Sequence, residues 1–154
     1  MLDVVLIYLP KPYLNQPDAQ APLGLMYIAS ALEANGKTVD LKSYASYTDE
    51  EAIRDLPAAK LYGITVTSLE LLQANRFAKL IKAKYPDAKI SIGGPGSINM
   101  EFVDYAVIDS ICFGDGEYTI LDMLDDAENN NLARSYQGKT VTDLDTLPLP
   151  ARHL

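Results

Sequence analysis

The sequence predicts an α/β fold built on one parallel β-sheet with helices on both faces. Three observations support this prediction. Short runs rich in β-branched residues alternate with segments in which apolar residues recur at helical spacing. The first run, residues 4–9, is apolar throughout, which is typical of a strand covered on both faces. Gly or Pro directly follows three of the runs, at Pro10, Gly93 and Gly114, so these strands end in turns.

The first two strands frame a long loop and a helix. Strand 4–9 ends at Pro10, and further prolines keep residues 11–21 irregular. Pro22 suits the first turn of a helix, because its missing N–H has no partner to lose there, and Gly36 is a good residue to end that helix. Residues 38–44 alternate between apolar and polar, which predicts an exposed edge strand.

Capping signals mark the next two helices. Thr48 with Glu51 matches a capping box and opens a short helix that should end near Pro57. A strand follows over residues 61–67. A second possible capping box, Thr67 with Glu70, opens a helix that Pro86 ends, and its predicted buried face comprises Ala74, Phe77, Ala78 and Ile81.

The last third of the chain carries two more strands. A strand over residues 88–92 ends in a glycine-rich turn at residues 93–96, and a short helix is expected over 99–105. The fifth strand covers 110–113, and the last helix carries Ile120, Leu121 and Leu124. Residues 136–141 predict a small hairpin, and 144–154 predict an extended linker.

Strands that alternate with helices imply right-handed βαβ units. The predicted fold is therefore a flavodoxin-like (Rossmann-type) three-layer sandwich with a five-stranded parallel sheet in the order 2-1-3-4-5 and a C-terminal extension. Its α/β domain covers residues 1–132, and residues 133–154 form the hairpin and linker. The loops at the carboxyl ends of the strands gather on one rim, which is the predicted binding site.

Charge and composition exclude several classes of function. With 13 Lys and Arg against 21 Asp and Glu, the formal charge is −8, which disfavours nucleic-acid and anionic-membrane partners. The single cysteine, Cys112, excludes an internal disulfide or a multi-cysteine metal site and suits a core position. The single histidine, His153, reads as a linker residue. No signal peptide or membrane-spanning run is visible, so a cytoplasmic protein is expected.

Two glycine-rich turns are the strongest candidates on the rim. The first, Gly93-Gly94-Pro95-Gly96, offers bare backbone to a ligand or forms a plain turn, and the two readings are equally supported. The second, Gly114-Asp115-Gly116-Glu117, offers free N–H groups to a ligand, but the commoner role of its acids is to cap the next helix.

Hydroxyl groups and tyrosines complete the candidate rim. Thr65, Thr67 and Ser68 can hydrogen-bond a ligand, although a local cap on the next helix is the commoner role of Thr67 or Ser68. Tyr8 is one of several tyrosines placed to line an apolar face. Neither a G-x-G-x-x-G motif after the first strand nor a P-loop motif is present, so the usual dinucleotide and nucleotide signals are missing.

Taken in the order in which they occur along the chain, these segments resemble the N-terminal cobalamin (B12)-binding domain of radical S-adenosylmethionine (SAM) enzymes. The resemblance covers essentially the whole chain and rests on seven segments in register, none of them diagnostic alone. These are residues 4–10, Pro22-Leu23-Gly24-Leu25-Met26-Tyr27-Ile28-Ala29, Tyr62-Gly63-Ile64-Thr65-Val66-Thr67, residues 81–86, Ile92-Gly93-Gly94-Pro95, Phe113-Gly114-Asp115-Gly116-Glu117 (the family usually shows G-E-G-E) and residues 144–152.

The resemblance implies a cobalamin ligand whose corrin ring lies on the rim and whose nucleotide tail enters a slot at the sheet edge. The residues implied in cofactor binding are Pro10, Leu23, Gly24, Thr65, Thr67, Ser68, Leu69, Gly93, Gly94, Pro95, Gly96, Gly114, Asp115, Gly116 and Glu117. No catalytic or metal-ligating residue is expected in this chain.

The sequence lacks two motifs of related proteins, and each absence changes what the resemblance implies. The loop 11–21 contains no histidine, so the D-x-H-x-x-G motif is missing and cobalamin is expected to bind without a protein histidine below cobalt. The C-x-x-x-C-x-x-C motif is also missing, so the [4Fe-4S] cluster and S-adenosylmethionine belong to a separate barrel domain. The chain is therefore expected to be an excised or naturally truncated domain that is not catalytic alone.

The predicted function is a cobalamin-binding module of a radical SAM, methyltransferase-like enzyme, with the barrel domain as its partner in cis. Two alternatives stay open. One is a degenerate module that no longer binds B12 and serves structure or substrate recognition. The other is a flavodoxin-like domain that binds a flavin or another nucleotide, against which the acidic rim argues.

Overall fold

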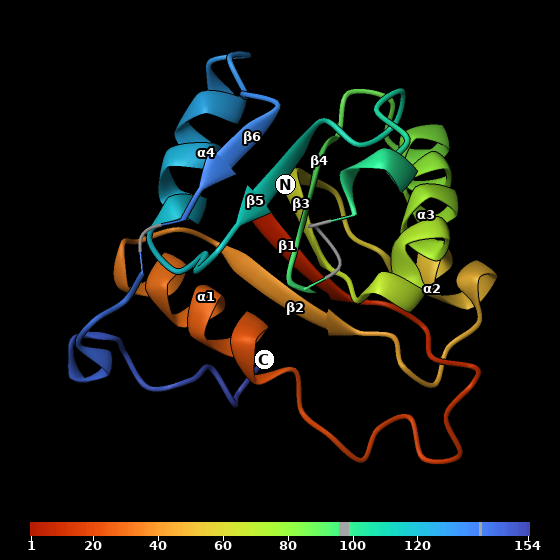
Figure 1. Cartoon of the computed structure of the whole chain (residues 1–154), viewed down its shortest axis with the longest axis horizontal. Coiled ribbons are helices and arrows are strands. Elements are labelled where there is room, and N and C mark those ends of the chain that lie inside the picture. Colours follow the sequence, from red (N-terminus) through yellow and green to blue (C-terminus); the bar gives the residue numbers. More distant parts are fainter. Residues whose placement is uncertain (96–98, 139) are drawn as a thin grey trace.

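The computed structural model describes residues 1–95, 99–138 and 140–154, and its described strands form one parallel sheet in the order β2-β1-β3-β4-β5-β6 (Figure 1). The elements run in chain order as β1 (Leu2–Tyr8), α1 (Leu23–Ala34), β2 (Val39–Ser43), α2 (Asp49–Asp55), β3 (Ala59–Thr65), α3 (Leu71–Lys84), β4 (Lys89–Gly93), β5 (Ser110–Phe113), α4 (Thr119–Glu128) and β6 (Ser135–Gln137).

Helices cover both faces of the sheet and make three layers, as the sequence predicts. α1 and α4 lie on one face and α2 and α3 on the other (Figure 1). The residues predicted to form the inner face of α3, which include Phe77 and Ile81, are fully buried. The flavodoxin-like order 2-1-3-4-5 is confirmed, and a sixth strand extends it at the β5 edge.

The register of the strands aligns three small residues with a leucine on the face covered by α1 and α4. Leu6, Gly63, Ser91 and Ser110 occupy neighbouring positions on β1, β3, β4 and β5. We call this row the lower rung. Two residues further along each strand, Tyr8, Thr65 and Gly93 are aligned in the same way and form the upper rung. The lower rung therefore lies deeper below the carboxyl rim than the upper rung.

Of the hairpin predicted over 136–141, residues 136 and 137 belong instead to the sixth strand, and residue 139 lies outside the described residues. β6 pairs in parallel with β5, which gives the edge of β5 a hydrogen-bonding partner. The Tyr136 hydroxyl donates to an oxygen of Asp126 on α4 at 2.6 Å, which fixes the strand beside that helix. The helix predicted over 99–105 is reduced to a 3₁₀ turn, Met100–Phe102.

The segment after β6 turns back along α1. The Ala151 amide donates to the Met26 carbonyl at 3.1 Å, and the Ala151 side chain is buried in the core shared by α1 and α4. His153 Nε2 lies 2.9 Å from Glu33 Oε1. The predicted linker is therefore attached to the domain along this helix. In the described part of the chain, no helix has the length and apolar character needed to cross a membrane.

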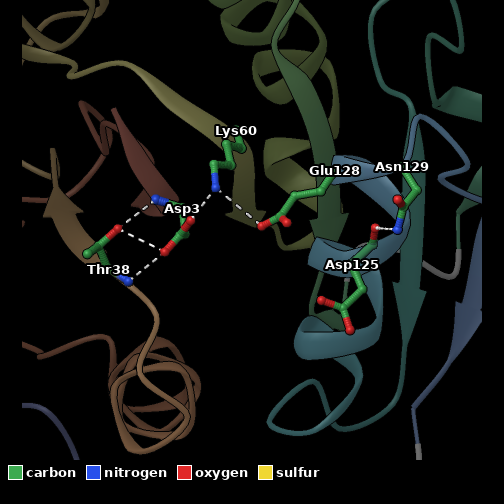
Figure 2. Close-up of polar contacts among 6 residues, drawn as sticks. All are labelled: Asp3, Thr38, Lys60, Asp125, Glu128 and Asn129. Atoms are coloured by element: carbon green, nitrogen blue, oxygen red, sulfur yellow. Dashed lines mark hydrogen bonds and ion pairs between the residues drawn. The ribbon is translucent and has the colours of Figure 1, made fainter.

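A polar cluster stabilises the opposite end of the sheet. Lys60 Nζ lies 2.7 Å from Asp3 Oδ1 and 3.3 Å from Glu128 Oε1, so it joins β1, β3 and α4 (Figure 2). Asp3 Oδ2 also accepts from the Thr38 amide and hydroxyl. The hydrogen bonds from Lys60 and Thr38 lower the pKa of Asp3 to about 2, so the folded state favours its charged form.

Substitution Asp3→Asn should lower the free energy of unfolding by about 1 kcal/mol at pH 7, because it removes a screened ion pair. The Asp3 contribution is present above its unfolded pKa of 3.8 and is lost as pH falls through about 2. Urea unfolding at several pH values should therefore show the variant and wild type converging below pH 4. Asp125→Asn is the control, since Asp125 is exposed and contacts Asn129 through its backbone carbonyl (Figure 2). An equal loss in both variants would contradict this account.

Candidate functional site

A cavity of about 320 Å³ opens at the carboxyl end of the sheet, on the face covered by α1 and α4. Its walls come from the ends of β1, β3, β4 and β5, the start of α1, and the loop that leads into α4. The cavity is at the low end of the range for small-molecule sites, so it suits a group about the size of a nucleoside. Nine residues predicted for the rim line it: Leu23, Gly24, Thr65, Gly93, Gly94, Gly114, Asp115, Gly116 and Glu117.

The cavity exists because three neighbouring sheet positions carry little or no side chain. Gly63, Ser91 and Gly93 all line it, on the face where parallel strands usually carry large apolar residues. A Cβ at Gly93 would lie 3.5 Å from the Cys112 carbonyl oxygen, an ordinary contact, so nothing in the local packing demands glycine there. The absence of a side chain at Gly93 therefore leaves cavity space above the upper rung, although the backbone conformation does not require glycine there.

Gly94 serves a different purpose. Its φ of +92° lies in the region that favours glycine, and a Cβ there would lie 2.9 Å from Thr65 Oγ1 and 3.0 Å from the Val66 carbonyl oxygen. The neighbouring Val66 amide donates to the Gly93 carbonyl at 2.9 Å. Gly94 is therefore required for close packing of the turn against the end of β3.

The loop that leads into α4 is packed on both sides. Gly114 has a φ of +75°, and a Cβ there would lie 3.1 Å from the Gly138 carbonyl oxygen. A Cβ at Gly116 would lie 3.1 Å from the Ile28 Cδ1 of α1. Asp115 Oδ2 accepts from the Val141 amide at 2.8 Å, so this carboxylate fastens the C-terminal segment to the cavity wall.

Glu117 presents an unsatisfied acceptor. Its Oε2 is buried and has no hydrogen-bond partner among the described residues, and the residue lines the cavity. Burial raises the pKa of the nearby Cys112 thiol, and the charge of Glu117 raises it further. The cavity wall therefore combines a neutral thiol with a carboxylate oxygen that lacks a donor.

Five predicted rim residues lie outside the cavity lining. The Pro10 carbonyl accepts from Gln73 Nε2 at 2.7 Å, and the Pro95 side chain of the glycine-rich turn is exposed. The amide and hydroxyl of Thr67 both donate to Glu70 Oε1, and Ser68 Oγ accepts from Asn99 Nδ2 at 2.9 Å. Leu69 is 87% exposed. Gly96 lies outside the described residues.

A buried ion pair fixes the loop that follows β1, and no sequence pattern predicted it. Lys11 Nζ contacts Glu70 Oε2, and both side chains are almost fully buried. The same ammonium lies 4.0 Å from the centre of the Tyr8 ring, which is close enough for a cation–π interaction. Tyr8 also lines the cavity, so the pair connects the loop, the start of α3 and the cavity wall.

Comparison with known proteins identifies this architecture. Residues 18–124 match the family model of the B12 binding domain. The chain belongs to the B12-binding domain family. A search of curated protein sequences finds no match.

Solved structures show the same fold. The B12-binding domain superposes on the cobalamin-dependent SAM radical enzyme OxsB, with aqua-cobalamin and SAM bound, at a TM-score of 0.68 and 21% identity over 86% of this chain. It superposes on the radical SAM methyltransferase TsrM from Kitasatospora setae at 0.63 and 20% identity over 84% of this chain. The chain spans 19% of OxsB and 26% of TsrM.

The residues present suit a cobalamin tail. A nucleotide tail carries hydroxyl groups, and cobalamin also carries amide N–H groups, so either can supply the donor that Glu117 Oε2 lacks. The open backbone of Gly93 and the apolar side chains of Leu6, Ile28 and Met123 suit a flat base. The unpaired acceptor and the shape of the cavity therefore both fit the group that the family implies.

Gly94→Ala should lower the free energy of unfolding by about 2 kcal/mol, because alanine at this positive φ is strained and its Cβ meets β3. Gly93→Ala is the matched control and should stay within about 0.5 kcal/mol of wild type. Urea denaturation of both variants measures the difference. If Gly93→Ala were the more damaging change, the roles given to the two glycines would be reversed.

Lys11→Met should cost about 3 kcal/mol of folding free energy, because it leaves the Glu70 carboxylate buried without its cation. Lys79→Met is the control: Lys79 Nζ lies 3.6 Å from Asp104 Oδ2 and is 62% exposed, so its loss should cost less than about 0.5 kcal/mol. Thermal or urea unfolding compares them. Similar small losses in both variants would show that the Lys11 pair does not hold the loop.

Proposed function

We propose that this chain binds cobalamin, with the nucleotide tail in the cavity and the corrin ring on the rim above it. The observation that supports this most directly is the cavity that Gly63, Ser91 and Gly93 open in a sheet face otherwise suited to large apolar residues. Its volume admits a nucleoside-sized group and is too small for a corrin ring. The ring would therefore rest against the loops of the rim.

We infer that cobalamin binds without a protein histidine below cobalt. His153 is the only histidine of the chain, and it lies beside Glu33 on α1. The loop between β1 and α1 instead contributes Lys11, whose ammonium is directed into the pair with Glu70. No nitrogen ligand of the histidine type is available from this loop, so the lower face of cobalt would be open to water or another small ligand.

The parent protein is proposed to be a longer radical SAM enzyme of the methyltransferase type. The B12-binding domain spans only 19% and 26% of its structural neighbours, which leaves room in such a chain for a barrel that carries the [4Fe-4S] cluster and S-adenosylmethionine. Methylcobalamin, when bound, supplies a methyl group for transfer. The residues of this chain would hold and orient the corrin, and none is proposed to act as an acid, base or nucleophile.

Exposed apolar side chains on or near the rim agree with a partner there. Leu69 and Leu72 follow the end of β3 and are 87% and 61% exposed, and Leu23 at the start of α1 is also exposed. Exposed apolar surface of this kind is typical of sites that bind a ligand or another domain. We propose that the corrin and a barrel domain in cis cover it, with no nucleic acid or membrane as partner.

Titration with hydroxocobalamin tests the proposal. Wild-type protein should retain the corrinoid through gel filtration, seen as co-eluting visible absorbance. Gly93→Leu should weaken binding at least tenfold, because the leucine side chain would fill the cavity space above the upper rung. Ala106→Leu places the same side chain at an exposed position and should bind like wild type. No retained corrinoid at excess ligand would favour the degenerate-module alternative, and retention of a flavin instead would favour the nucleotide-binding one.

The axial ligand has its own test. After reduction of the bound cofactor to cob(II)alamin, the electron paramagnetic resonance spectrum should lack the threefold superhyperfine splitting that an axial nitrogen produces. His153→Ala should leave the spectrum unchanged. Splitting in the wild type that disappears in this variant would show that His153 ligates cobalt.

A further inference from the structure

A serine at the floor of the cavity, Ser91, has a second, fully buried serine, Ser110, beside it on the next strand. Ser91 lines the cavity and is 3% exposed, and Ser110 occupies the neighbouring position on β5. The Ser110 side chain is fully buried, and its Oγ has no hydrogen-bond partner among the described residues. Both belong to the lower rung, whose other members are Leu6 and Gly63.

We propose that these serines make the module selective for a cobamide whose lower base has a polar edge, such as adenine, over cobalamin, whose dimethylbenzimidazole base ends in two methyl groups. This inference rests on the proposed function, because it assigns the base at the end of the nucleotide tail. Ser91 would contact the base, and on binding the Ser110 hydroxyl, unpaired among the described residues of the free protein, would turn to bond with that of Ser91 from the adjacent strand.

The argument starts from the burial of the hydroxyl groups. A buried hydroxyl without a partner, as at Ser110 in the described part of the chain, is destabilising, and this serine adjoins Ser91 in the cavity lining. The pair therefore favours a ligand that can hydrogen-bond with Ser91. A serine hydroxyl donates one hydrogen bond and accepts others. The amino group and ring nitrogens of adenine provide both a donor and acceptors, whereas a dimethyl edge provides neither.

The other residues around the cavity floor are apolar or lack a side chain, so the polar edge of a base would face Ser91. Gly63, beside Ser91, has no side chain to cover it, while Leu6 on the next strand is apolar. Met123 of α4 contributes a further apolar group to the cavity. A base held between apolar walls would therefore meet the polar floor through its edge. A site built to hydrogen-bond a ligand discriminates strongly against an analogue that leaves its buried polar groups unpaired.

Comparative titration of three hydroxocorrinoids tests the proposal: the adenine cobamide, cobalamin and cobinamide, which has no nucleotide tail. The adenine cobamide should bind at least tenfold more tightly than cobalamin. Ser91→Ala should bring the two dissociation constants within about twofold of each other. Ser110→Ala should reduce the preference and raise the urea midpoint, because it removes the unpaired hydroxyl. Binding of cobinamide should not change in either variant.

The outcomes separate this inference from the proposed function. If none of the three corrinoids binds, the proposed function fails and the inference with it. If cobalamin binds as tightly as the adenine cobamide, or if Ser91→Ala keeps the wild-type preference, the serines do not select the base although the module binds corrinoids. Circular dichroism of both variants should match wild type, since each substitution removes a single oxygen atom.

Discussion

Close packing normally fills the space between a parallel sheet and the helices that cover it, and here three small residues interrupt that packing. Gly63 and Ser91 lie on adjacent strands of the lower rung, and Gly93 lies two residues beyond Ser91. The side chains of α1 and α4 approach from the other side, but the space above these positions stays open. The position of the cavity at the carboxyl end of the sheet thus follows from where the small residues fall in the strand register.

Further contacts hold the rim around this opening. Gly94 lets the turn after β4 approach β3 closely, and the buried pair of Lys11 and Glu70 fixes the loop after β1 against the start of α3. On the far side, Asp115 accepts from the Val141 amide and Ala151 packs on α1. The C-terminal segment therefore contacts both the loop before α4 and the helix α1, which together form one wall of the cavity.

Much of the fold could be predicted from local patterns. The apolar run of β1, the Thr48–Glu51 capping box and the inner face of α3 depend on residues close in sequence, and the structure confirms them. β6 has only three residues and is stabilised by pairing with β5 and by the bond from Tyr136 to Asp126, which are partners distant in sequence. The neighbouring sequence, a short polar run, therefore could not predict that this strand pairs in parallel with β5.

The candidate site was predictable in position but only partly in its residues. The rule that ligands meet the carboxyl ends of parallel strands placed it at the rim where the cavity opens. The sequence could not separate Gly93, which opens the cavity, from Gly94, which the backbone requires, because that difference depends on φ and on the distance to β3. Nor could it assign Lys11, whose partner lies 59 residues away, or the serine pair, which only the strand register brings together.

Hydrogen–deuterium exchange with and without hydroxocobalamin tests most directly whether this cavity receives the ligand. Binding there should slow exchange at the amides of residues 23–28, 63–66, 91–94 and 114–117, and leave the amino end of the sheet around Asp3 and Lys60 unchanged. Protection confined to the opposite end of the sheet, or none at saturating ligand, would contradict the assignment of this cavity as the cobalamin site.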